Sequence, residues 1–244
     1  MTASEARRYQ WQQLKGQPLS AKLKHIFTFY WPVIIACVCV IGIAVSWIGN
    51  ILGQKELVLC GFFPNSALSE SYQGDFGEEF LAHLNLDPEK NEFRITSNIS
   101  YSKDDRSESS IYVMESMVTQ VAAGELDFFV VDEESYPAFS SYYADLRTVL
   151  SAEQLDRWSA NLIYAEQADL QKWSSGDLGQ ELVYPKYSAT TDGMTDPIPM
   201  GIRLPETCRL RQAYLFPQGD VIFSVCASAQ HQDNVLAFLE YILE

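Results

Sequence analysis

The chain has 244 residues, enough for one medium-sized domain with an anchor, and its charged fraction of 20% is typical of a folded protein. Its charge is uneven: the residues before Lys55 carry +4 and the remainder −19, for a total of −15. A domain this acidic repels phosphate backbones, which excludes nucleic acid as a partner.

An uncharged segment dominates the N-terminal part. No charged residue occurs from His25 to Gln54, and the centre of this run is almost wholly apolar. A membrane-spanning helix needs about 20 such residues, so we expect a transmembrane helix over 26–53, with Pro32 near its start. All nearby Lys and Arg precede it, which predicts a basic cytoplasmic tail over 1–25 and an extracellular remainder. The lipid bilayer is then the first partner of this cell-membrane protein.

Two processed N-termini are the alternatives. A cleaved signal peptide has an apolar region of about 7–15 residues followed by a small-residue cleavage site, and this run is longer and lacks such a site. A lipoprotein anchor would use Cys37, but the apolar run continues well past that residue. An uncleaved single-pass helix is therefore favoured.

The first half of the outer region alternates strands and helices. Apolar runs predict strands over 56–63, 93–96 and 126–131. One helix is expected after the capping residue Asp75, with 87–88 as its stop. A second helix ends at Gly124, and its expected apolar face consists of Ile111, Met114, Val118, Val121 and Ala122. Strands and helices alternating at this spacing indicate right-handed crossovers and a parallel sheet.

The second half is less regular. Ser151 predicts another capped helix, and a terminal helix over 234–243 has Val235, Phe238, Leu239 and Ile242 on one face. Short strands are expected at 162–164, 182–184, 198–204 and 221–227. We predict one α/β domain over 56–244, built on a mixed, largely parallel sheet.

The cysteines and histidines carry no catalytic or metal-binding pattern. The sequence does not decide whether two of the three outer cysteines form a disulfide. These cysteines are Cys60, Cys208 and Cys226, and Cys208–Cys226 is the first candidate pair. There is no C-x-x-C, G-x-S-x-G or H-E-x-x-H motif, and no histidine has a partner at metal-ligand spacing. We therefore expect no metal, no cofactor and no enzymatic activity.

A ligand site is expected where parallel strands end. Ligands of open α/β sheets bind outside the carboxyl ends of the strands, at the switch point. The candidate ligand-binding residues follow the first and third strands: Phe63, Asn65, Ser66, Asp132, Glu133 and Tyr136. Aromatic walls with a few carboxylates suit a polar or cationic ligand. The acidic run 132–134 has a second interpretation, as the start of a helix whose dipole favours carboxylates.

Three segments carry a family resemblance: 121–132, with its Ala-Ala-Gly turn before an acidic strand, 145–155, and 198–204. Together they resemble type 2 extracellular solute-binding proteins, and the layout is similar to single-pass proteins of Gram-positive anaerobes. The resemblance implies a reduced, membrane-anchored fold of the periplasmic-binding-protein type, because about 190 residues after the anchor are few for two lobes. It implies a tethered module that captures a small ligand or assists a membrane transporter. The alternative is a ligand-free structural or interaction subunit of a membrane complex.

Overall fold

The computed structural model describes residues 18–102, 105, 107–175, 184–217 and 219–243, without the side chains of 21–30 and 48–52. The chain divides into two compact units, Met1–Gln54 and Lys55–Glu244. Most of the predicted cytoplasmic tail, 1–17, lies outside the described residues. So do residues 182 and 183 of the strand predicted over 182–184.

The first unit contains one long helix, α2 (Leu19–Leu52). Pro32 lies well inside this helix, so its predicted position near the helix start is wrong. The helix begins earlier than the apolar run because Leu, Ala and Lys, which favour helices, precede that run. In the part of the chain that the structure describes, no helix has both the length and the apolar character needed to cross a membrane.

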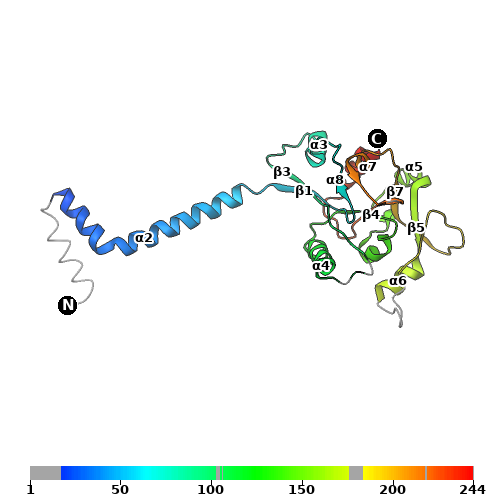
Figure 1. Cartoon of the computed structure of the whole chain (residues 1–244), viewed down its shortest axis with the longest axis horizontal. Helices are drawn as coiled ribbons and strands as arrows, with labels where there is room; N and C mark the ends of the chain where they lie inside the picture. Colours follow the sequence, from blue (N-terminus) through cyan, green and yellow to red (C-terminus); the bar gives the residue numbers. More distant parts are fainter. Residues whose placement is uncertain (1–17, 103–104, 106, 176–183, 218, 244) are drawn as a thin grey trace. The chain divides into compact units, whose positions relative to one another are not determined.

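The second unit is built on a seven-stranded sheet with the strand order β3-β1-β4-β9-β7-β5-β6 (Figure 1). Its strands are β1 (Glu56–Phe62), β3 (Asn91–Thr96), β4 (Phe128–Asp132), β5 (Leu162–Glu166), β6 (Tyr187–Ser188), β7 (Pro197–Leu204) and β9 (Val221–Val225). Two short strands, β2 (Ala67–Leu68) and β8 (Tyr214–Leu215), form a separate antiparallel pair.

The α/β class and the mixed sheet are confirmed. Strand β1 pairs in parallel with both β3 and β4. The pairs β4–β9, β7–β9, β5–β7 and β5–β6 are antiparallel. The sheet is therefore not largely parallel. Parallel pairing is confined to β1, whose two neighbours β3 and β4 follow it in the chain through connections that contain α3 and α4.

The helices begin and end as local chemistry dictates. They are α3 (Phe76–His83), α4 (Glu108–Ala123), α5 (Ala152–Arg157), α6 (Gln167–Ser175), α7 (Arg209–Ala213) and α8 (Gln232–Leu243). The Asp75 carboxylate accepts from two backbone N–H groups of α3, and a capping box of Ser151 and Gln154 opens α5. Three short 3-10 helices, η2 (Tyr136–Tyr142), η3 (Leu146–Thr148) and η4 (Ser159–Asn161), were not expected, and neither were α6 and α7.

Hydrophobic clusters cover both faces of the sheet, since consecutive strand residues point to opposite sides. Phe128 belongs to the cluster with Phe80 of α3 and Phe238 of α8, whereas Phe129 joins Met117 of α4 on the other face. Figure 1 shows α3 and α8 on one side of the sheet and α4 on the other. The described outer region is thus one lobe around one sheet.

The three outer cysteines are buried and free. Cys208 packs in the cluster that contains Phe128, whereas Cys226 and Cys60 pack in the cluster on the opposite face. The disulfide between Cys208 and Cys226, which the sequence left open, is not formed, because the sheet separates the two thiols.

The predicted core face of α4 is wrong in part. Met117 is fully buried against the sheet, and Val113 and Val121 pack beside it. Ile111 is 50% exposed and Val118 is 41% exposed, although both were expected to face the core. The helix is therefore rotated relative to the expectation and leaves apolar side chains on the surface.

Candidate functional site

The switch point of the sheet lies at the carboxyl ends of β1 and β4. From β1 the chain passes through α3 to β3 on one side, and then through α4 to β4 on the other. Asn65 follows β1 and Asp132 ends β4. The Asn65 Nδ2 donates to Asp132 Oδ2 at 2.9 Å and to Ser135 Oγ at 3.0 Å. The structure thus brings together two of the residues predicted to bind a ligand.

The polar groups at this switch point are satisfied by one another. Asn65 Oδ1 accepts from the Tyr101 backbone N–H at 2.7 Å, and Asp132 Oδ1 accepts from the Ser135 backbone N–H at 3.0 Å. Asn65 has φ 56°, a left-handed conformation that Asn tolerates better than most residues. Because Asp132 is only 5% exposed, its carboxylate is committed to this network.

Two further predicted residues have packing roles. Phe63 is fully buried, with its ring centroid 5.6 Å from that of Phe128 and 5.3 Å from that of Tyr214. The Ser66 Oγ donates to the Phe63 carbonyl at 2.7 Å and closes the turn after β1. Ser66 also lines, with Asn65, an open and uncharged pocket of about 500 Å³.

The last two predicted residues, Glu133 and Tyr136, line a different pocket. Its volume is about 390 Å³, and its charged lining residues are Glu133, Lys186, Arg203 and Asp220. Arg203 Nε lies 2.7 Å from Asp220 Oδ2, so these two form an ion pair. Among the described residues, neither Glu133 nor Lys186 has an ion-pair partner. The pocket therefore offers one carboxylate and one ammonium group to a ligand.

Tyr136 forms the inner wall of this pocket. Its hydroxyl lies 2.6 Å from Ser224 Oγ, which in turn donates to the Met200 carbonyl at 2.8 Å. Burial raises the pKa of the Tyr136 phenol well above its ordinary value. Gly201 permits this approach, because a Cβ there would lie 2.5 Å from the Tyr136 hydroxyl. The hydroxyl is thus held on the sheet, which leaves the ring as the part that borders the pocket.

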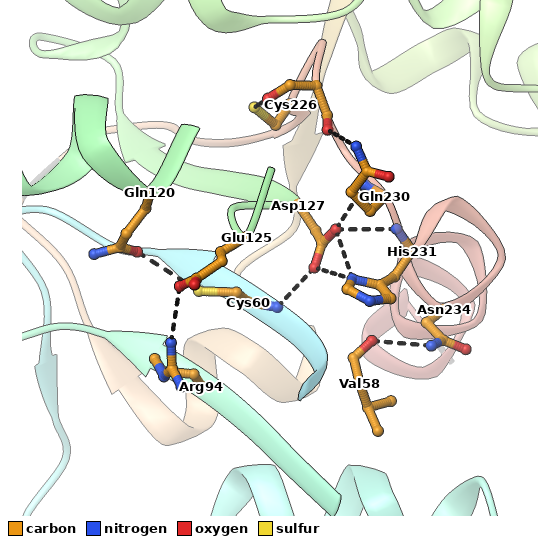
Figure 2. A network of polar contacts seen from close by, with 11 residues as sticks. Val58, Cys60, Arg94, Gln120, Glu125, Asp127, Cys226, Gln230, His231 and Asn234 are labelled. Carbon is orange, nitrogen blue, oxygen red and sulfur yellow. Dashed lines mark hydrogen bonds and ion pairs between the residues drawn. The ribbon is translucent and has the colours of Figure 1, made fainter. Parts of the chain in front are cut away.

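A second polar network, which the sequence did not predict, surrounds the buried carboxylate of Asp127 (Figure 2). This carboxylate accepts from the backbone N–H groups of Cys60, Gln230 and His231 at 2.9, 3.2 and 3.1 Å, and it lies 3.0 Å from His231 Nδ1. Asp127 therefore connects β1, the start of β4 and the N-terminus of α8. The sequence contained one signal for this network: Asp127 is an acidic residue inside the apolar run 126–131.

The Asp127 network lacks a nucleophile. The Cys60 Sγ contacts Gln120 Oε1 at 3.7 Å, and burial raises the pKa of this thiol to about 12, so it stays protonated at neutral pH. His231 is 31% exposed and is oriented by Asp127, yet no reactive side chain is hydrogen-bonded to it in the described residues. In that part of the chain there is also no group of three or more His, Cys, Asp or Glu able to hold a metal ion.

Comparisons of the chain with protein-family models, curated proteins and solved structures found no match. The geometry of the described residues is therefore the basis for assigning a function.

Proposed function

We propose that the chain is a membrane-tethered extracytoplasmic binding module, with its N-terminus in the cytoplasm. The uncharged run from His25 to Gln54 supports the tether. So does the exposure of apolar side chains around α2, such as Ile35, Val38 and Ile43, which are 47%, 63% and 69% exposed. Apolar side chains exposed to this extent suit a lipid environment. The one-sided basic charge supports the orientation.

The ligand site is the pocket beside Glu133. One pocket is lined by Glu133 and Lys186, neither of which has an ion-pair partner among the described residues, and by Tyr136 and the Arg203–Asp220 ion pair; this observation carries the assignment. Its volume is at the small end of ligand sites. A small polar ligand with a cationic group beside Glu133 and an acceptor beside Lys186 fits these charges.

Thermal unfolding of the full chain in detergent tests the pocket. The probes are free amino acids, choline and putrescine, with citrate as an anionic comparison. We expect at least one cationic probe to raise the Tm of the wild type and to lose at least about three quarters of that effect in Glu133→Gln. Glu134→Gln removes an exposed neighbouring charge outside the pocket and should keep the effect. An equal Tm shift in Glu133→Gln would refute the assignment.

The tether is tested by adding protease to intact cells that express the chain with a tag at each end. The C-terminal tag should be removed and the N-terminal tag retained. A C-terminal tag that survives protease on intact cells but not on lysed cells would refute this topology.

A second function, the ligand-free interaction subunit, is favoured by a different observation. An open and mainly apolar groove of about 730 Å³ lies along α4 in the outer unit. Exposed apolar patches of this kind mark protein–protein contacts. If no probe changes the Tm, the interaction subunit becomes the better assignment.

A further inference from the structure

The open pocket of about 500 Å³ that Asn65 and Ser66 line lies outside the carboxyl ends of β1 and β3. Ligands of open α/β sheets bind at such strand ends. Its walls are the segments 65–67, 98–100 and 215–217, and none of these described lining residues is charged. Asp105, the next described acid along the chain, lines the groove along α4 instead. The pocket therefore differs in character from the charged pocket beside Glu133.

The loops that follow β1 and β3 are joined to each other at this pocket. The Asn65 backbone N–H donates to the Ile99 carbonyl at 2.8 Å, and the Asn98 backbone N–H donates to the Ser66 carbonyl at 2.7 Å. Asn98 has φ 58°, a left-handed conformation that Asn tolerates. Because the backbone is already fixed, a ligand would not have to order these loops, which lowers the cost of binding.

Two polar side chains of the pocket are available to a ligand. Asn98 and Ser100 are exposed, and no described residue is hydrogen-bonded to either side chain. An amide and a hydroxyl each offer both a donor and an acceptor, and the hydroxyl groups of a sugar likewise donate and accept. An ionic ligand would lose hydration here without meeting an opposite charge among the described lining residues. The polar groups therefore favour an uncharged, hydroxylated ligand.

Phe216 supplies an apolar wall. Its half-buried ring has its centroid 6.5 Å from that of Phe63, which is fully buried, so the core supports the ring. A pyranose has an apolar C–H face that can pack on an aromatic ring while its hydroxyl groups form hydrogen bonds. The pocket thus combines an aromatic ring with an amide and a hydroxyl, and a sugar has the matching groups.

From these observations we propose that the pocket at the ends of β1 and β3 binds an uncharged sugar unit. Asn98 and Ser100 bind its hydroxyl groups, and Phe216 packs on its C–H face. Because the pocket is open, the unit can be the end of a longer glycan. This site shares no lining residue with the pocket beside Glu133, so it is a second binding site and each can be tested without the other.

The test is isothermal titration calorimetry of the full chain in phosphatidylcholine nanodiscs, because detergents with sugar headgroups would compete for the site. The probes are the methyl glycosides of glucose, galactose, mannose and N-acetylglucosamine. Glucosamine and glucuronate are the charged comparisons, and empty nanodiscs give the background. We expect at least one neutral glycoside to bind saturably at a ratio of one to one, and both charged sugars to bind at least threefold more weakly.

Substitutions locate the binding. Asn98→Gly removes the amide but keeps the left-handed backbone, and it should weaken binding at least fivefold. Asn85→Gly is the matched control, because Asn85 is also exposed and also has φ 58° but lies outside the pocket; it should change binding less than 1.5-fold. Phe216→Leu should weaken binding at least threefold. Ser100→Ala takes its place if the near-ultraviolet circular dichroism of the Leu variant is not native.

The two sites are distinguished by exchanging their variants. Glu133→Gln should leave sugar binding unchanged, and Asn98→Gly should leave any Tm shift caused by a cationic probe unchanged. The proposal is overturned if no neutral glycoside binds saturably. It is also overturned if binding persists at full strength in Asn98→Gly and in Phe216→Leu or its replacement.

Discussion

Asp127 shows how one buried carboxylate can organise an outer domain. It is fully buried, and its oxygens receive three backbone N–H groups and the His231 ring. Two of those N–H groups immediately precede α8, so the carboxylate also caps that helix and lies at the positive end of its dipole. Burying this carboxylate is tolerable because backbone N–H groups donate to both of its oxygens.

Replacing this carboxylate with an amide should be costly. In Asp127→Asn the amide NH₂ would face backbone N–H donors, so at least one buried donor loses its acceptor. We expect a loss of about 2–4 kcal/mol in the free energy of unfolding. Urea unfolding of the full chain in detergent, followed by near-ultraviolet circular dichroism, measures it. Asp156→Asn, an exposed site on α5, is the control and should change stability by less than about 0.5 kcal/mol; equal effects at both sites would contradict the role given to Asp127.

At the scale of the element, the end of α4 depends on one backbone conformation. Gly124 has φ 70° and ψ 20°, and its N–H bonds to the carbonyls of Gln120 and Val121. The next N–H, that of Glu125, also bonds to Gln120 at 2.9 Å. This left-handed termination lets the chain turn directly into β4.

Gly124→Ala should lower the free energy of unfolding by about 1–2 kcal/mol, because a Cβ is disfavoured in the left-handed region. The added Cβ would also lie 3.1 Å from Gln230 Nε2, which the flexible Gln230 side chain can relieve. Gly124→Asn is the matched control, since Asn tolerates this conformation and should recover at least half of the loss. Urea unfolding measures both variants. An Asn variant no more stable than the Ala variant would show that the conformation is not the cause.

Helix ends were predictable, and so was the buried face of α8, but the buried face of α4 was not. Asp75, Gly124 and Ser151 act on neighbouring backbone groups, so the sequence around each contains the whole interaction. The face of α4 has two apolar stripes, one through Met117 and the other through Ile111 and Val118. Only packing against the sheet decides which stripe is buried, and that packing involves residues distant in sequence.

At the scale of the whole molecule, topology located the predicted site but not its chemistry. The alternation of strands and helices correctly placed Asn65 and Asp132 at the carboxyl ends of the neighbouring strands β1 and β4. Their mutual hydrogen bond joins residues 67 positions apart, and nothing local to either residue encodes it. The antiparallel pairing of β5, β6, β7 and β9 was not predicted for a related reason. The sequence of a short strand does not specify the direction of the strand beside it.

Burial of phenols and a thiol makes the whole outer domain sensitive to alkali. Burial raises the pKa of Tyr214 and of Cys60 to about 12, and it raises the pKa of Tyr136 and Tyr143 well above the ordinary value. For these groups the folded state holds the proton more tightly than the unfolded state. Their contribution to stability is therefore complete below the unfolded pKa, near 9 for the thiol and 10 for the phenols, and is lost as the pH rises toward the folded values.

We expect the free energy of unfolding to fall steeply above about pH 10. Each buried phenol adds up to about 1.4 kcal/mol per pH unit to this slope. Tyr136→Phe should be less stable than the wild type at pH 7 by about 1 kcal/mol, because it loses the hydrogen bond to Ser224. Its slope above pH 10 should be shallower, so the difference from the wild type shrinks by about 1 kcal/mol between pH 10 and 11. Urea unfolding at a series of pH values, with phenolate absorbance at 295 nm as a parallel readout of ionisation, measures the slopes; parallel curves for the two proteins would show that Tyr136 ionises without unfolding.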